Sequence, residues 1–281
     1  MASISPVPYF VPKPSRFPIR TGIALLLMVL GAAAWINRAQ PGPYLLGCGV
    51  FLLALVLIGW FGALIREGPQ FNGQVDQSLR WGMAWFIFSE VMFFGGLFAA
   101  LFYVREVSIP DLSHGASASL WPGYAGGWPA SGPLITSELH PMSWKGAPAL
   151  NTILLLCSGV AITFAGRAIR QGKQGLLSVL LAVTVALGAT FLFKQAGEYH
   201  HALTDLHLTL SEGAYGATFY LLTGFHGVHV AIGTAMVFVM LVRSLLHQFT
   251  PAHHLGLEMV SWYWHFVGVV WLLLYVIVYV L

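Results

Sequence analysis

Hydrophobic residues run in long blocks along the chain, separated by short polar segments. A helix needs about 20 apolar residues to cross about 30 Å of hydrocarbon. Seven blocks meet this length: residues 20–37, 44–65, 81–104, 148–168, 175–196, 213–242 and 258–281. An open sheet would leave backbone groups unpaired in lipid. We therefore predict an all-α membrane protein with seven transmembrane helices.

The polar segments divide the chain into four parts. We expect an N-terminal arm over residues 1–19, two helices within 20–65, a loop over 66–80, and five helices within 81–281. The segment 107–147 is long and rich in Gly, Pro, Ser and Trp, which is typical of an irregular, aromatic-studded cap. A loop of this length is either a binding surface or a tolerated insertion.

Basic residues give the orientation of the chain, because cytoplasmic loops carry an excess of Lys and Arg. If the N-terminus is cytoplasmic, nine of the 13 basic residues lie inside and four lie outside. The inner set is Lys13, Arg16, Arg20, Arg66, Arg80, Arg167, Arg170, Lys173 and Arg243, and the outer set is Arg38, Arg105, Lys145 and Lys194. This predicts a cytoplasmic arm, a cytoplasmic 66–80 loop, an outer 107–147 loop and an outer C-terminus.

Composition supports a membrane protein and excludes other classes. The chain is 57% hydrophobic and 8% charged, whereas soluble domains carry about 25% charged residues. The small net charge of +3 comes mostly from basic residues in the loops of a membrane protein and does not indicate nucleic-acid binding. Cys48 and Cys157 each lie in an apolar block without a CxxC spacing, which predicts neither a disulfide nor a metal site.

One carboxylate interrupts the third block. Glu90 lies in FIFSEVMFF, about 15 Å from the start of its span at 1.5 Å per residue, so it lies near the bilayer midplane. A charge there costs roughly 2.5–3.5 kcal/mol on insertion scales, so the group either finds a partner or keeps its proton.

Polar residues of other blocks offer partners for Glu90. His226 and His229 are three apart, on one helical face. Glu258, Trp262 and His265 lie in the last block, and Glu198 follows the fifth. Three hypotheses remain open for this set: a metal site of Glu90, His226 and His229, a proton relay, or a hydrogen-bonded network that fixes helix packing.

A second polar group lies at the cytoplasmic helix ends. Arg66 and Glu67 follow the second block, and Arg243 and His247 follow the sixth. A guanidinium presents a planar fork of donors that suits a lipid phosphate. We expect these four residues, together with Trp60, to bind phospholipid; ordinary positive-inside anchoring is the alternative.

At these residues the chain resembles subunit III of haem–copper cytochrome c oxidase. RWGMAWFIFSEVMFF at 80–94 looks like the family's third helix, and PALNTILLLCSGVAIT at 148–163 looks like its fourth. QAGEYHHA at 195–202, GAYGATFYLLTGFHGVHVAIGT at 213–234 and HHLGLEMVSWYWHFVGVVWLLLY at 253–275 resemble the fifth to seventh. The resemblance covers nearly the whole chain, and 107–147 is its variable part.

The resemblance implies a fold and a role. The family has two helices standing apart from five, with a lipid-filled cleft between them. Its subunit carries no redox centre and no metal, while haem a and copper lie in partner subunits. It implies contact with subunit I, membership of a complex with subunit II, electrons from cytochrome c, and support for proton uptake and for active-site lifetime. The chain would thus be a non-catalytic part of a proton-pumping enzyme complex.

Individual positions carry over unequally. Glu90 matches the family's buried Glu. Cleft residues near lipid headgroups are matched by Arg66, Glu67 and Arg243. Polar positions of the last two helices are matched by His226, His229, Glu258, Trp262 and His265. The chain departs from the family pattern at Gly268, which stands at an often acidic position, at Gly166–Arg167, which replaces a His pair, and at Leu246, which replaces a basic residue.

Two alternative functions remain at this point. One is subunit III of a quinol oxidase, although such relatives tend to lack the first two helices. The other is a stand-alone proton-coupled transporter that uses Glu90 and His226. The N-terminal sequence has no signal or transit character, which favours a bacterial inner membrane as the location.

Overall fold

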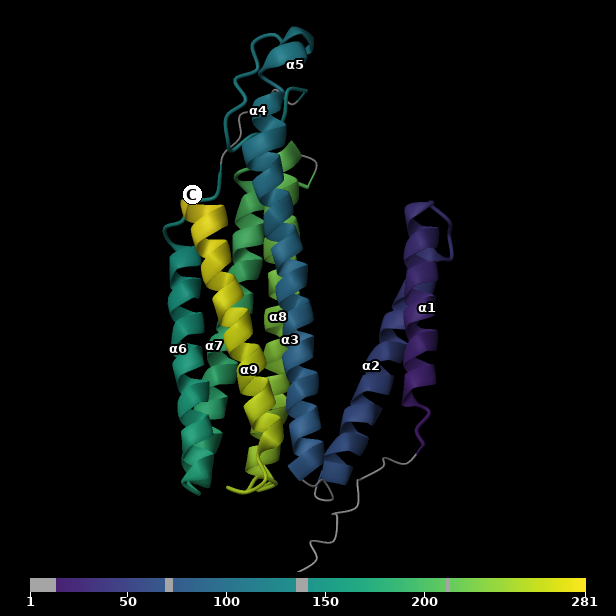
Figure 1. The fold of residues 1–281 in the computed structure, drawn as a ribbon, viewed down its shortest axis with the longest axis vertical. Coiled ribbons are helices and arrows are strands. Elements are labelled where there is room, and N and C mark those ends of the chain that lie inside the picture. Colours follow the sequence, from purple (N-terminus) through teal and green to yellow (C-terminus); the bar gives the residue numbers. More distant parts are fainter. Residues whose placement is uncertain (1–13, 69–72, 135–140, 211–212) are drawn as a thin grey trace, which may run out of the picture. The chain divides into compact units, whose positions relative to one another are not determined.

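The computed structural model describes residues 14–68, 73–134, 141–210 and 213–281, and its secondary structure over these ranges is helical throughout. The long helices are α1 (Phe17–Ile36), α2 (Gly42–Glu67), α3 (Gly73–Tyr103), α6 (Ala147–Arg170), α7 (Gln174–Thr204), α8 (Gly213–Leu245) and α9 (Leu255–Leu274). The short elements are η2 (Val104–Ser108), α4 (Ile109–Asp111), α5 (Gly115–Leu120) and η3 (Tyr275–Val280). The chain divides into two compact units, up to Arg80 and from Trp81 (Figure 1).

Seven helices among the described residues are long and apolar enough to cross a membrane, which confirms the predicted fold class. Their ends differ from the expected ones. Residues 73–80, expected in a loop, form the first turns of α3, and the helix continues through η2 and α4 to Asp111. Helix α7 runs on to Thr204, so Glu198 lies inside the helix and not beyond it. The apolar blocks did not predict either extension, because the added turns contain polar residues. Such residues lower the hydropathy of a segment but can still form a helix.

Helices α1 and α2 form a hairpin that depends on glycine. A Cβ on Gly31 would lie 2.3 Å from the backbone nitrogen of Leu46, and one on Gly42 would lie 2.4 Å from that of Trp35. Ala24 is fully buried in the same interface. Without a hydrophobic driving force between helices in lipid, such close backbone approach supplies the packing energy.

The second unit is a bundle in which α3, α6, α7, α8 and α9 run side by side (Figure 1). Trp264 of α9 lies at its centre and is 1% exposed. Its ring lies against Gly188 of α7 and Gly233 of α8, where added Cβ atoms would come within 2.8 and 3.0 Å of ring carbons. Its indole N–H donates to the Ser158 hydroxyl of α6 at 3.0 Å. One side chain therefore joins four helices.

Two further side chains of α9 form hydrogen bonds with hydroxyl groups of α6. Trp271 donates to Thr152 at 2.9 Å, and the His265 Nε2 atom lies 3.0 Å from the Thr163 hydroxyl. The hydroxyls of Thr152, Ser158 and Thr163 each donate to a carbonyl of their own helix. Each oxygen is therefore left as an acceptor for α9. The row of three contacts fixes the register of α9 against α6.

The 107–147 segment is attached to the bundle end where α4 and α5 project (Figure 1). The backbone N–H of Met142 donates to the Tyr215 hydroxyl at 3.1 Å, and the backbone N–H of Tyr215 donates to the Ala130 carbonyl at 3.1 Å. Trp128 packs against the Tyr215 ring at a centroid distance of 5.7 Å. The described part of the segment is thus packed onto the start of α8 and contains short helical turns, so it is less irregular than expected.

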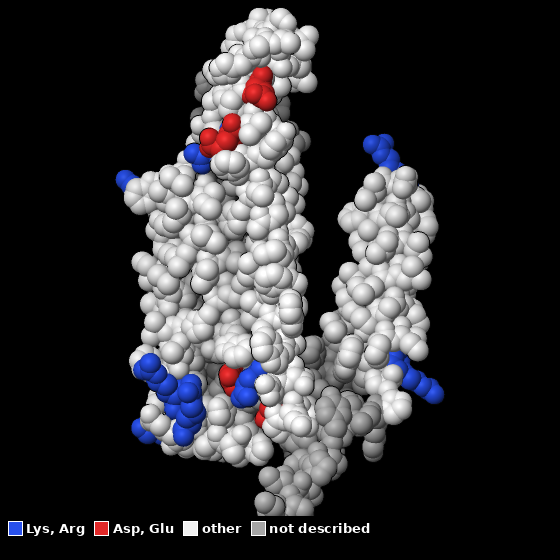
Figure 2. Space-filling model, viewed as in Figure 1, with Lys and Arg blue, Asp and Glu red and all other residues white. Residues whose placement is uncertain are grey.

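Charged groups lie at the two ends of the bundle, and an uncharged band separates them on the face seen in Figure 2. At one end are Arg167 and Arg170 of α6, Lys173, and Arg243 of α8. The other end carries Arg105, Glu106 and Asp111. This distribution is what a membrane-spanning bundle requires, since a charge within the hydrocarbon is costly.

The position of Trp264 generates a stability prediction. Gly188→Ala should destabilise the bundle by about 1–3 kcal/mol, because the new methyl group overlaps the Trp264 ring and the Thr234 hydroxyl. Gly197→Ala is the matched control on the same helix, since nothing lies within 4 Å of its Cβ position. Thermal unfolding in detergent should show a lower midpoint for the first variant alone. Equal midpoints would contradict the central role of Trp264.

Candidate functional site

Glu90 of α3 is paired with His229 of α8. The carboxyl Oε2 lies 2.9 Å from the His229 Nε2 atom, and the two side chains are 21% and 13% exposed. The other ring nitrogen, Nδ1, lies 2.7 Å from the Phe225 carbonyl oxygen, one turn earlier in α8. The half-buried carboxyl therefore has a partner from another helix.

The hydrogen bonds define what this pair can hold. A carbonyl oxygen only accepts, so the His229 Nδ1 atom must donate to Phe225. The contact between Nε2 and Glu90 then shares one proton in either of two forms. Either a protonated carboxyl donates to the ring, or an imidazolium donates to the carboxylate. The pair is a site for one proton, and it carries no net charge in both forms.

Aromatic rings surround the pair, and the Tyr263 hydroxyl of α9 donates to the His229 carbonyl oxygen at 3.4 Å. Phe94 packs against His229 at 5.0 Å, and Phe93 packs against Phe225 at 5.0 Å. One turn earlier on α3, Phe86 stacks on Tyr263 of α9 at 6.0 Å. Large rings thus hold α3 against α8 and α9, and the Glu90–His229 hydrogen bond lies among them. In this low-dielectric setting the hydrogen bond is strong, and removing one partner is costly.

His226 does not join this pair. Its ring is 1% exposed, stacks on Trp271 at 5.2 Å and meets the edge of Phe191 at 5.9 Å. Among residues 14–68, 73–134, 141–210 and 213–281, no three His, Cys, Asp or Glu side chains converge as metal ligands do. In this structure the three residues proposed for a metal site, Glu90, His226 and His229, therefore do not converge. Three residues of helix turn the two histidines about 60° apart, which is enough to direct them to different neighbours.

A second buried polar group lies near the ends of α7 and η3. Glu198 and Gln195 are each 4% exposed, and the Tyr279 hydroxyl lies against both. Tyr279 also packs against Trp271, which stacks on His226. Sequence reasoning missed this group because it placed Glu198 beyond the fifth span and singled out neither Gln195 nor Tyr279. The i, i+3 spacing of Gln195 and Glu198 within one helix was the available signal.

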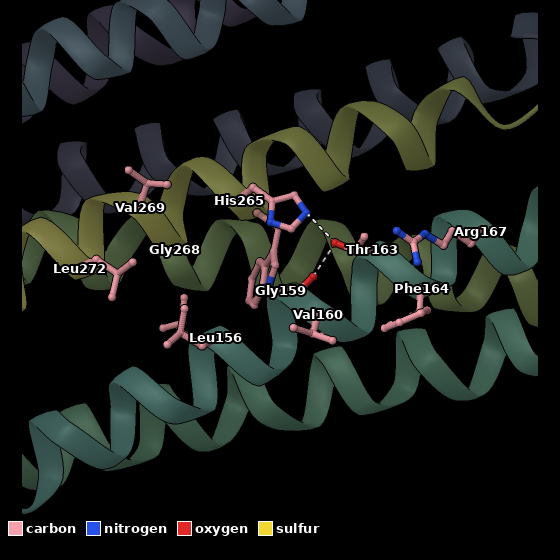
Figure 3. Close-up of a pocket in the computed structure, with 12 residues that line it drawn as sticks. Leu156, Gly159, Val160, Thr163, Phe164, Arg167, His265, Gly268, Val269 and Leu272 are labelled. Carbon is pink, nitrogen blue, oxygen red and sulfur yellow. Dashed lines mark hydrogen bonds between the residues drawn. The ribbon is translucent and has the colours of Figure 1, made fainter.

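The remaining predicted polar residues occupy a third place. Glu258, Trp262 and His265 are spaced i, i+4 and i+7 on α9, so they share the face directed to α6. All three line a cavity of about 250 Å³ between α6 and α9, and His265 also lines a second cavity of about 380 Å³. Figure 3 shows His265 bonded to Thr163 in the middle of this groove. The six predicted residues are therefore distributed over three locations and do not form one network.

The expected lipid-binding residues lie at helix ends, in two units. In the first unit, Arg66 and Glu67 form the last turn of α2, and Trp60 stacks on Phe17 at 5.9 Å. In the second unit, Arg243 of α8 lies over the Phe249 ring at 4.6 Å and donates through Nε to Gln248 at 3.1 Å. His247 is exposed in the turn that follows.

The C-terminal end of α7 carries a hydrogen-bonded pair of His201 and Asp205. The His201 Nδ1 atom hydrogen-bonds to the Asp205 carboxylate. This hydrogen bond holds the pKa of Asp205 below its usual range. Both groups are exposed, so the pair marks a solvated helix end and not a functional centre.

Comparison with known proteins identifies the chain's relatives. The family model described as cytochrome c oxidase subunit III matches residues 7–281. Proteins named cytochrome c oxidase subunit 3 from Oryctolagus cuniculus and Squalus acanthias are 38% and 39% identical over 275 residues, covering 96% of this chain and 96% of each relative. The protein of that name from Scyliorhinus canicula is 40% identical over 276 residues, covering 97% of this chain and 96% of its own. The chain therefore belongs to the cytochrome c oxidase subunit III family.

Proposed function

We propose that this chain stabilises the catalytic subunit I of a proton-pumping terminal oxidase, sustains proton uptake there and binds phospholipid. The observation that carries the proposal is the family match from residue 7 to residue 281, which takes in all seven helices. In this proposal haem a and copper are held by partner subunits, subunit II belongs to the same complex, and cytochrome c supplies the electrons.

The bundle surface is consistent with such a partner. Phe88, Trp85 and Val91 of α3 are each more than two-fifths exposed within this chain, on the helix that carries Glu90. A large apolar face suits either lipid or a neighbouring transmembrane subunit. We propose subunit I for this face, since Glu90–His229 then lies near the boundary of the two subunits.

We also propose a bacterial inner membrane, with the N-terminus in the cytoplasm and the C-terminus in the periplasm. The bundle end with Arg167, Arg170, Lys173 and Arg243 would face the cytoplasm, because positive loops stay on that side. The 107–147 segment would then lie on the periplasmic face.

Removing the chain tests the proposal. An oxidase purified without this subunit should keep its haem a bands and its initial rate of cytochrome c oxidation. It should lose activity sooner during sustained turnover and take up protons more slowly, because the proposed support for subunit I is gone. Stopped-flow spectroscopy and a pH indicator measure both quantities. An unchanged turnover lifetime with unchanged proton uptake would refute the proposed role.

The Glu90 site makes a separate prediction. Glu90→Gln should leave assembly and electron transfer nearly intact, because the amide can donate to the His229 Nε2 atom in place of a protonated carboxyl. Glu90→Leu should destabilise the chain by about 1–3 kcal/mol, because it leaves that nitrogen buried without a partner. Thermal unfolding and subunit content of the purified complex measure the contrast. Loss of the assembled complex in Glu90→Gln would contradict a local role.

Lipid binding at the α8 end is tested by charge removal. Arg243→Gln should lower the amount of phospholipid that copurifies with the complex, because a headgroup phosphate loses its guanidinium partner. Arg105→Gln is the control, since Arg105 lies in η2 and pairs with the adjacent Glu106. Phosphorus analysis after detergent exchange measures the lipid. Equal phospholipid content in both variants would mean that Arg243 only anchors the helix.

A further inference from the structure

Five buried side chains of the bundle carry polar atoms that make no hydrogen bond to any described residue. They come from α6, α7, α8 and η3, and each is less than a tenth exposed. They are Asn151, Gln195, Glu198, His226 and Tyr279. The first four contribute two atoms each and Tyr279 contributes one, which makes nine. A buried polar atom without a partner costs about 1–3 kcal/mol, so this group needs a further binding partner if its members lie together.

Gln195 of α7 and His226 of α8 lie at the same level of the bundle. The Tyr199 hydroxyl of α7 donates to the Thr223 hydroxyl of α8 at 2.8 Å. The rings of Phe191 and His226 have their centroids 5.9 Å apart. Gln195 lies one turn from Phe191 and one turn from Tyr199, on the same face of α7. It is therefore enclosed between these two contacts, opposite His226.

Trp271 of α9 brings further members of the group to this level. Its ring stacks on His226 at 5.2 Å and packs against Tyr279 at 6.1 Å. Its indole N–H donates to Thr152, which is the neighbour of Asn151 in α6. Asn151 is fully buried, on a helix that packs against α7 and η3. Side chains of α6, α8 and η3 therefore meet at one indole ring.

The last turn of the chain directs Tyr279 into the bundle. Element η3 is a π-helix, a form that is rare and often found at functional sites, and Tyr279 is its buried residue. The Tyr279 hydroxyl lies against Gln195 and Glu198. Its oxygen nevertheless makes no hydrogen bond of normal geometry to either of them. The three polar groups are thus close together without direct bonds, which is the arrangement that a bridging ligand produces.

The mixture of donors and acceptors indicates the kind of ligand. Each amide has an NH₂ donor and a carbonyl acceptor, and a neutral imidazole has one nitrogen of each kind. Glu198 is in none of the ion pairs that the described residues form. A carboxyl group in the membrane without a cation keeps its proton, so it too donates and accepts. A metal cation would bind only the oxygen atoms and leave the N–H groups unpaired, whereas water serves both kinds.

We propose that the bundle interior beside Trp271 binds a cluster of water molecules. Buried water makes about three hydrogen bonds, so about three molecules would serve the nine polar atoms. The waters bridge Gln195, Glu198 and Tyr279 and extend to Asn151 and His226. They join α6, α7, α8 and η3 by hydrogen bonds that the side chains do not make directly. Such bonds add to the close packing that holds transmembrane helices together.

Electron cryomicroscopy of the oxidase complex, purified through a tag on this chain, tests the site. One map is recorded in sodium buffer and one in choline buffer. Both should show density within about 2.7–3.2 Å of polar atoms from at least two of the five side chains. Polar atoms in direct contact, with no density between them, would overturn the proposal. A density seen only in sodium buffer would overturn it in favour of a cation.

Radiolytic footprinting in heavy-oxygen water gives a second test. An X-ray pulse forms hydroxyl radicals from bound as well as bulk water, and they oxidise the nearest side chains. His226 is shielded from bulk water by its burial, so its oxidation reports internal water. His226 and Tyr279 should take up heavy oxygen. Trp264 should not, because it is equally buried and donates directly to Ser158. Equal uptake at His226 and Trp264 would contradict the site, and this comparison needs no variant.

A matched pair of variants assigns the uptake to the polar group. Gln195→Met should abolish labelling of His226, because methionine has a similar length but no group that holds water. Thr184→Val is the control on the same helix. Thr184 is fully buried, lies about three turns away, and its hydroxyl donates to the Leu180 carbonyl of its own helix. Labelling of His226 that persists in Gln195→Met, or that is lost equally in both variants, would overturn the proposal.

Discussion

The position of Trp264 is the constraint on which the packing of α6, α7, α8 and α9 depends. Its indole lies between Gly188 and Gly233, and its N–H is accepted by the Ser158 hydroxyl. In lipid, helices gain little from apolar burial alone, so close packing and interhelical hydrogen bonds must hold them together. Trp264 supplies both kinds of interaction to α6, α7 and α8 at once. The parallel contacts of Trp271 with Thr152 and of His265 with Thr163 then fix α9 along α6.

Helix α3 is held against α8 and α9 by different contacts. Aromatic rings of α3 pack against rings of α8 and α9, and the Glu90–His229 hydrogen bond lies among them. A pair that shares one proton without net charge satisfies two polar groups inside the membrane. This answers why a carboxylate stands in the apolar run FIFSEVMFF: it fixes α3 to α8 at a depth where an unpaired group would be costly.

Sequence reasoning was most successful where periodicity and composition carry the information. It found each of the seven helices and the family to which they belong. Only packing distinguishes Gly233, where an added Cβ would come within 3.0 Å of the Trp264 ring, from Gly227, which has nothing within 4 Å of its Cβ position. Sequence reasoning recognised Glu90 and His229 as candidates, yet it could not separate His229 from His226. The two histidines point only about 60° apart around the helix, and side chains of neighbouring helices determine which of them meets Glu90. Glu198 was misplaced since polar turns at the end of α7 weaken the hydropathy signal while the helix continues. The α6–α9 groove depends on missing side chains at Gly159 and Gly268, which no motif records.

We propose that this chain works inside an oxidase, as its family membership indicates. Mild-detergent purification through a tag on this chain, followed by a reduced-minus-oxidised spectrum and mass analysis of the copurified proteins, tests that claim most directly. We predict haem a bands together with two larger redox subunits. A colourless protein that purifies alone would contradict the account and favour a stand-alone transporter.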